Sequence, residues 1–254
     1  MTAVREAALA LPAMPAVDFD AATHTYTVRG RRLPSVTELV KSVSAPFDAQ
    51  AAAERVAARR SAAYGRQVAA GEVLAEWEEA GRRARESGRA THEAIERVLG
   101  GSGGADGTAE FRAWSAWWAS GPSSSLSVVA KEEAVADEAL GVAGRLDALL
   151  ASAKTGVAHV FDWKTGKRYE FASRYGDKML APFSDLDDCE HSRYSLQASV
   201  YRLVLERAGL ACGESWVVRL PASGPAAAYR AADLRARAEA WLAGREDARR
   251  AIEK

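Results

Sequence analysis

The stretch GVAGRLDALLASAKTGVAHVFDWKTGK, residues 141–167, decides the fold of this protein. It contains two apolar runs, at about 142–150 and 157–164, separated by a turn-forming segment at 152–156. Runs of this length, bounded by turn residues, are typical of two β-strands in a hairpin. Each run carries charged residues toward one end, and these residues indicate a chemical role for the hairpin.

The charged residues of the hairpin are Asp147, Asp162 and Lys164. Side chains alternate between the two faces of a strand, so Asp162 and Lys164 point the same way while Trp163 points to the other face. Asp147 can lie close to Asp162 on the neighbouring strand, although residue spacing alone does not fix the register. Two converging carboxylates repel each other and lose hydration, which is costly without a compensating cation.

Magnesium or manganese would supply that cation, because both prefer oxygen ligands and keep water positions open. A lysine beside such a metal could orient or help deprotonate an attacking water and stabilise charge on a phosphoryl group. The alternative is two surface carboxylates and a salt-bridging lysine on the polar face of a hairpin. Spacing alone does not decide between these interpretations.

The remaining sequence predicts an α/β fold in which a central mixed sheet contains an antiparallel meander and is flanked by helices. A third strand at 126–136 turns at 137–141 into the hairpin. The period of apolar residues and the capping signals predict further elements as well. These are a hairpin beginning at Thr25–Val28, a helix opened by a Ser35 and Glu38 capping box, helices at about 48–64, 72–99 (which Gly88 could break), 108–120, 186–208 and from 232, and strands at 215–220 and 226–231.

Composition along the chain divides it into four expected segments. Residues 1–17 form a flexible N-terminal arm, and 18–99 form a hairpin and helical region that packs on the core. A glycine-rich loop at 100–107 follows, because glycines end the preceding helix. Residues 108–254 then form the core.

Overall composition indicates an ordinary globular protein of 254 residues with 48% hydrophobic content. The 34 basic residues equal the 34 acidic residues, so no global field attracts nucleic acid and any basic surface must be local. Two cysteines are too few for a disulfide framework or an iron–sulfur cluster, and we expect none. Without a signal-like N-terminus or a long apolar stretch, the expected location is the cytoplasm.

Three motifs occur in order along the chain. They are Gly144 with Asp147 in AGRLDALL, Asp162 with Lys164–Gly166 in VFDWKTGK, and Gln197 with Tyr201 in YSLQASVYRLVLE. Jointly they resemble the RecB-like, phage-exonuclease-like branch of the PD-(D/E)XK nuclease superfamily, over about residues 85–205. The resemblance implies a restriction-endonuclease-like core. It also implies magnesium- or manganese-dependent hydrolysis of DNA phosphodiester bonds, by an exonuclease that acts on DNA ends or single strands in recombination, repair or defence.

The resemblance also implies site residues. Asp147, Asp162 and the main-chain carbonyl of Trp163 would hold the metal, and Lys164 would serve the water. The stretch ESGRATHEAIERVL matches the helical Gly-x-x-x-His element of the family and makes His92 a further candidate ligand. Read alone, a histidine on an amphipathic helix is more often a capping or core residue.

Three more candidates come from the same resemblance. Glu132 fits the acidic position on the preceding strand, with Glu133 as the rival, and only one of these neighbours can face the site. Gln197 and Tyr201 share a helical face and could contact a phosphate or orient Lys164. The alternative for this pair is packing of the helix on the sheet.

Basic residues near the motifs are candidates for contacts with the DNA backbone. They are Arg89 on the helix before His92, and Lys167, Arg168, Arg174 and Lys178 after the catalytic strand. Tyr169, Phe171 and Tyr175 are interleaved with these charges and could stack on unpaired bases or pack the loop against the sheet.

The expected partner is therefore DNA. The chain has no Walker-type glycine loop, so a helicase or recombination partner would be a separate protein. Two other functions remain open from the sequence: a catalytically inactive DNA-binding or assembly module of the same fold, and a structure-specific or RNA-directed endonuclease. Oligomeric state and cleavage polarity are also open.

Overall fold

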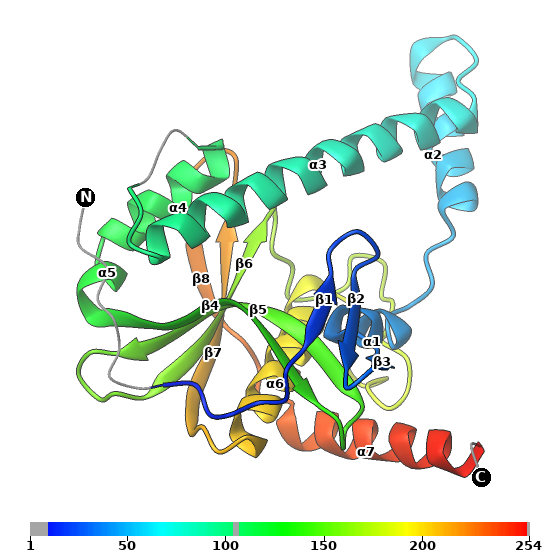
Figure 1. Ribbon diagram of the computed structural model, residues 1–254. Coiled ribbons are helices and arrows are strands. Elements are labelled where there is room, and N and C mark those ends of the chain that lie inside the picture. The colour runs from blue at the N-terminus through cyan, green and yellow to red at the C-terminus, as the bar shows by residue number, and fades with distance from the viewer. Residues whose placement is uncertain (1–9, 104–106, 253–254) are drawn as a thin grey trace.

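The meander expected from residues 126–164 forms three neighbouring strands of a five-stranded mixed sheet (Figure 1). The computed structural model describes residues 10–103 and 107–252. The strand order is β4-β5-β6-β7-β8; β6 and β7 run parallel, and the other neighbours are antiparallel. The strands are β4 (Leu126–Asp137), β5 (Val142–Ser152), β6 (Ala158–Thr165), β7 (Cys212–Leu220) and β8 (Ala227–Arg230). The α/β class and the three consecutive strands are thus confirmed.

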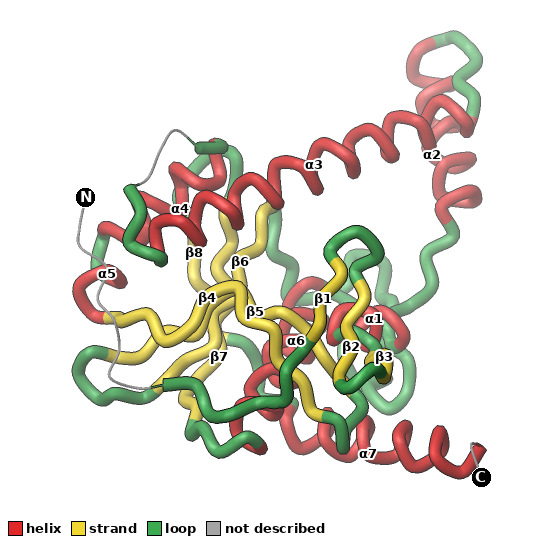
Figure 2. Tube along the Cα trace, viewed as in Figure 1, coloured by secondary structure: helices red, strands yellow, loops and turns green. Residues whose placement is uncertain are grey.

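Helices cover both faces of this sheet (Figures 1 and 2). On one face, α4 (Ala109–Ala119) and the C-terminal half of α3 (Ala70–Leu99) bury the indoles of Trp114 and Trp163 in one core cluster. On the other face, a larger core cluster joins the sheet to α1 (Val36–Ser42), α6 (Glu190–Arg207) and α7 (Arg235–Ile252). A short helix, α5 (Pro122–Ser125), links α4 to β4.

A small antiparallel sheet precedes these layers and consists of β1 (Asp18–Asp20), β2 (Thr25–Val28) and β3 (Arg31–Leu33). Arg29 and Gly30 form the predicted turn between β2 and β3, with φ of 52° and 78°, as the tight turns of two-residue hairpins require. The predicted capping box is confirmed: Ser35 Oγ accepts from Glu38 N, and the Glu38 carboxylate accepts from Ser35 N.

A helical hairpin projects from the body of the molecule and consists of α2 (Ala49–Tyr64) and the N-terminal half of α3 (Figure 2). The sequence left open a break near Gly88, but α3 continues through this residue. A glycine costs a helix only about 1 kcal/mol. A Cβ at Gly88 would lie 3.2 Å from Thr165 Oγ1, so the glycine allows α3 to lie close to the end of β6.

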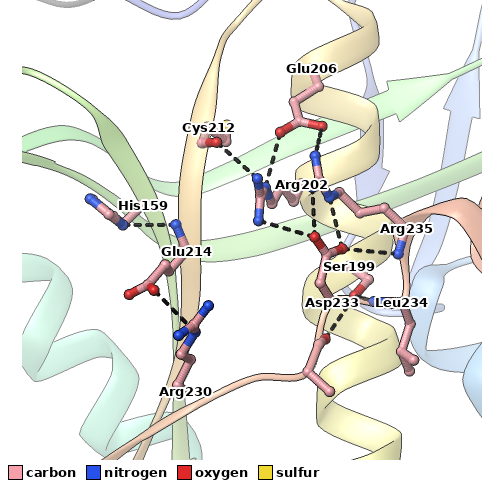
Figure 3. Close-up of polar contacts among 11 residues, drawn as sticks. His159, Ser199, Arg202, Glu206, Cys212, Glu214, Arg230, Asp233, Leu234 and Arg235 are labelled. Carbon is pink, nitrogen blue, oxygen red and sulfur yellow. Dashed lines mark hydrogen bonds and ion pairs between the residues drawn. The ribbon is translucent and has the colours of Figure 1, made fainter.

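An ion network made of Arg202, Glu206, Asp233 and Arg235 ties α6 to the start of α7 (Figure 3). Arg202 Nε donates to Glu206 Oε1 over 3.0 Å, and Arg202 Nη2 donates to the carbonyl oxygen of Cys212 on β7 over 3.0 Å. Arg235 binds both carboxylates of the network. This α6–α7 ion network therefore fixes a helix, a strand and the chain entering α7 to one another.

Parts of the expected segments lie outside the described residues, namely 1–9 of the N-terminal arm, 104–106 of the glycine-rich loop and 253–254 at the end of the core. Among the described helices, none combines the length and the apolar character needed to cross a membrane.

Candidate metal centre

The pairing of β5 with β6 ends where the charged residues begin. The last paired residues at this end are Ala148 and Phe161. Beyond them, the side chain of Asp147 bonds to the neighbouring strand: its Oδ2 accepts a hydrogen bond from Trp163 N over 2.6 Å. A carboxylate thus replaces the next main-chain acceptor of the ladder. The strands bring Asp147 and Asp162 side by side, as the hairpin pattern led us to expect.

His92 of α3 and Glu132 of β4 join Asp147 at this point. His92 Nδ1 lies 3.4 Å from Glu132 Oε1 and 3.5 Å from Asp147 Oδ1. One ligand atom from each of the three residues lies within 4.8 Å of the others. Helix α3 and the neighbouring strands β4 and β5 therefore converge on a group with the donor set of a divalent metal site.

Glu132 reaches this group from an unusual backbone conformation. Its φ is 46°, in the left-handed region, which costs a non-glycine residue on the order of 1–3 kcal/mol. Arg145 Nε holds it in place by donating to the Glu132 carbonyl oxygen over 2.9 Å and lying 3.1 Å from Oε2. Glu133 is exposed, so Glu132 is the member of the pair that faces the group.

His92 is oriented through its second ring nitrogen. Nε2 lies 3.1 Å from the Trp163 carbonyl oxygen, and a hydrogen on Nε2 would leave the Nδ1 lone pair facing the carboxylates. Burial alone lowers the pKa of His92, but Asp147 and Glu132 outweigh burial and raise that pKa to about 9. In the metal-free protein His92 is therefore a cation at neutral pH and must lose its proton to bind a metal.

Asp162 lies beside this group but is not one of its three members. Its carboxylate is 3% exposed, and Oδ1 accepts from Lys164 Nζ over 2.9 Å and from Gln197 Nε2 over 3.0 Å. Lys164 Nζ also lies 2.9 Å from Oδ2, yet the angle does not make a hydrogen bond, and Oδ2 has none within the described residues.

The ionisation of this pair follows from its burial. Burial raises the pKa of Asp162 to about 6, and the Lys164 ammonium opposes that rise. Burial also lowers the pKa of Lys164, but Asp162 and Asp147 outweigh burial and raise that pKa above its ordinary value. At neutral pH the two side chains are thus an ion pair, and Asp162 retains a buried acceptor oxygen that an ion could use.

Two residues of the site were not found from the sequence. Tyr194 lies under Lys164, with Nζ 4.9 Å from the centre of its ring, and Arg145 holds Glu132. Helical spacing could have indicated Tyr194, which is three residues before Gln197. Strand alternation could have indicated Arg145, which is two residues before Asp147.

Tyr201 does not reach the site surface. Its side chain is buried at 3% exposure, and its hydroxyl donates to the Arg145 carbonyl oxygen over 2.8 Å. A Cβ at Gly144 would lie 2.8 Å from Tyr201 Cε1, so the glycine accommodates the ring. Tyr201 and Gly144 therefore pack α6 on the sheet, and the phosphate contact that the sequence suggested for this phenol does not fit its burial.

The basic residues expected to contact DNA divide into two sets. Those with an acidic neighbour are Arg174 with Glu170, Lys178 with Asp187, and Arg89 with Glu93 at 3.8 Å. Lys167 and Arg168 are exposed and form no ion pair with any residue of 10–103 or 107–252. These two follow β6 directly and are the best placed for a phosphate.

The aromatic residues interleaved with these charges fall into two sets, packed and exposed. Tyr169 stacks on Tyr229 of β8, with ring centres 4.2 Å apart, and Phe171 lies 4.7 Å from the ring of His191. Those two rings pack the loop on the sheet and α6. Tyr175 is 88% exposed and packs on nothing comparable among the described rings.

Comparison of this chain with models of known protein families returns no match, and comparison with curated proteins returns no match either.

Proposed function

We propose that this protein is a magnesium- or manganese-dependent deoxyribonuclease of the PD-(D/E)XK type. The observation that carries the proposal is the convergence of His92, Glu132 and Asp147 beside the Asp162 and Lys164 pair. Such a group is costly to assemble without a function, because Glu132 is held in a left-handed backbone conformation and the Asp162 and Lys164 charges are buried.

The residues fit a divalent metal by their chemistry. Glu132, Asp147 and His92 Nδ1 would hold it; Asp162 is not part of this group, and the Trp163 carbonyl faces His92 Nε2 instead. When bound, such an ion acts as a Lewis acid toward a phosphoryl oxygen and lowers the pKa of a bound water.

The residues around the ion have separate tasks. Lys164, fixed by Asp162 and by the ring of Tyr194, can orient the attacking water and stabilise charge that develops on the phosphoryl oxygens. Gln197 holds the Asp162 carboxylate from α6, and Arg145 holds Glu132. These two residues act on the reaction through their neighbours.

The direct test is cleavage of end-labelled linear duplex, circular duplex and single-stranded DNA, with magnesium or manganese. Wild type should cut at least one of these substrates, and EDTA should stop the reaction. Lys164→Ala should lower the rate by about 10²–10³-fold, the size of effect seen when one donor to a developing charge is removed. DNA binding should be retained.

A matched control is Lys154→Ala, because Lys154 lies exposed in the turn at the other end of the same β5–β6 hairpin. That variant should cut like wild type. The proposal fails if wild type is inert on all three DNAs with both metals. If wild type binds DNA without cutting it, the inactive binding module takes the place of the nuclease.

A further inference from the structure

A cleft of about 680 Å³ opens beside the C-terminal end of β6. Its walls are the segment leading into α2, the loop after β6 and the start of α6. Tyr194 lines the cleft and also contacts Lys164, with Nζ 4.9 Å from the ring centre. The ring of Tyr194 therefore lies between the cleft and Lys164, which itself does not line the cleft.

Two aromatic side chains stand exposed in the walls of this cleft. Phe47, from the segment before α2, is 74% exposed, and Tyr175, from the loop after β6, is 88% exposed. Single exposed apolar residues are common on protein surfaces, but two large rings in one cleft indicate a ligand. Aromatic faces of this kind stack on nucleic-acid bases of any sequence.

The charges of the cleft are arranged unevenly. Two of its four basic residues are held by acidic neighbours, Arg174 by Glu170 and Arg193 by Asp188. Lys167 and Arg168, at the β6 end, form no ion pair within the described residues. Asp177 and Glu190 also line the cleft, so Lys167 and Arg168 are its basic residues best placed to contact a phosphate.

We propose that this cleft binds a short unpaired stretch of DNA. Phe47 and Tyr175 stack on its bases, Lys167 and Arg168 contact its phosphates, and the strand then passes Tyr194 to Lys164. A volume of this size encloses ligands of roughly nucleotide dimensions, since sites for such molecules measure about 300–1,000 Å³. The inference rests on the proposed nuclease function and names its substrate as an unpaired strand or end.

The test is binding of a fluorescent single-stranded oligonucleotide and of a blunt duplex to the full chain in EDTA, where no cleavage occurs. Phe47→Ala and Tyr175→Ala should each weaken single-strand binding by about five- to a hundredfold, the range for loss of one stacked base. Duplex binding should change little. Tyr64→Ala is the matched control, because Tyr64 is 64% exposed at the end of α2 and does not line the cleft.

The proposed phosphate contacts of Lys167 and Arg168 are tested by the salt dependence of binding. Replacing Lys167 and Arg168 together by alanine should flatten the salt dependence of single-strand binding, by a slope of about 0.7 for each phosphate that is no longer neutralised. Replacing Arg174 should change that slope less, because its guanidinium is already paired with Glu170.

The binding and cleavage measurements test the cleft proposal and the nuclease proposal separately. The cleft proposal is overturned if Phe47→Ala and Tyr175→Ala bind and cut single strands like wild type, or if Tyr64→Ala weakens binding equally. If Phe47 and Tyr175 are required for single-strand binding but wild type cuts nothing with either metal, the cleft stands and the nuclease fails.

Discussion

Helix α6 takes part in two charged clusters that differ in the backbone conformation and the pKa values of their carboxyl residues. At its C-terminal half, the α6–α7 ion network pairs each of its four charges with an opposite one (Figure 3). Nearer its N-terminus, Gln197 contacts the second cluster, in which Asp162 Oδ2 has no hydrogen bond and Glu132 has a left-handed backbone.

The two clusters also shift the pKa values of their carboxyl groups in opposite directions. Arg235 holds the pKa of Asp233 down at about 2, so the ionised form is favoured in the folded network. Burial raises the pKa of Asp162 to about 6, so the ionised form is disfavoured there. The comparison teaches that charge alone does not identify a functional site. What marks the candidate metal centre is charge held against its own energetic preference, as sites with perturbed ionisation often show.

The largest contrast is expected in catalysis. Asp162→Asn keeps the shape of the carboxyl but removes the charge that holds Lys164, so the cleavage rate should fall by about 10²-fold or more. Asp233→Asn removes a carboxylate of the ion network and should leave the rate within about twofold of wild type. Cleavage of labelled DNA with manganese measures both variants. Equal losses of cleavage rate in Asp162→Asn and Asp233→Asn would show that the two clusters do not differ in their role in catalysis.

The second contrast concerns pH. Burial lowers the pKa of His92, but Asp147 and Glu132 raise it from 6.5 to about 9. A raised pKa contributes stability that is complete below pH 6.5 and lost as the pH rises through about 9. Metal-free protein should therefore lose stability in mild alkali, by on the order of 3 kcal/mol.

The ion network should respond at the other end of the pH scale. The lowered pKa of Asp233 contributes stability that is present above pH 3.8 and lost as the pH falls through about 2. Urea unfolding between pH 6 and 9.5 measures the His92 effect without disturbing the network. His92→Gln should flatten the alkaline slope; a slope unchanged in that variant would assign the loss to other groups.

The third contrast concerns metal binding. Manganese at a hundred times its dissociation constant should raise the free energy of unfolding of wild type by about 2.7 kcal/mol. Asp147→Asn should abolish most of this gain, because it removes a charged ligand. Glu206→Gln, a carboxylate of the ion network, should retain it. Thermal unfolding with and without manganese tests both, and a retained gain in Asp147→Asn would remove that residue from the metal site.

The smallest effect is expected from Arg202→Ala. Arg202 is 16% exposed and bonds to Glu206 and to the Cys212 carbonyl, so its loss should cost about 1–3 kcal/mol of stability. Cleavage rate and the response to manganese should not change at a temperature where the variant is folded. A loss of manganese response would couple the two clusters and contradict their separate roles.

Local patterns were enough to predict most of the fold. The apolar runs bounded by turns predicted β4, β5 and β6 to within two residues, and Ser35 with Glu38 predicted the start of α1. These signals depend on side-chain alternation and capping, which act over a few residues.

The candidate site was predicted in part. Strand alternation predicted that Asp162 and Lys164 share a face, and the hairpin brought Asp147 beside them. The left-handed backbone of Glu132 had no local signal, because it depends on the contact that Arg145 makes from the next strand, and no local pattern indicated that the ring of Phe47 is exposed. The sequence left open a break at Gly88; α3 is continuous there, and the glycine allows the approach of Thr165.

A crystal soaked in manganese would show whether His92, Glu132 and Asp147 bind a metal ion. Anomalous scattering should give one strong peak within about 2.0–2.4 Å of ligand atoms from His92, Glu132 and Asp147, the range for hard divalent ions bound by oxygen and imidazole. The same peak should be absent from Asp147→Asn crystals. A fully occupied manganese elsewhere, with no peak among these three residues, would contradict the account.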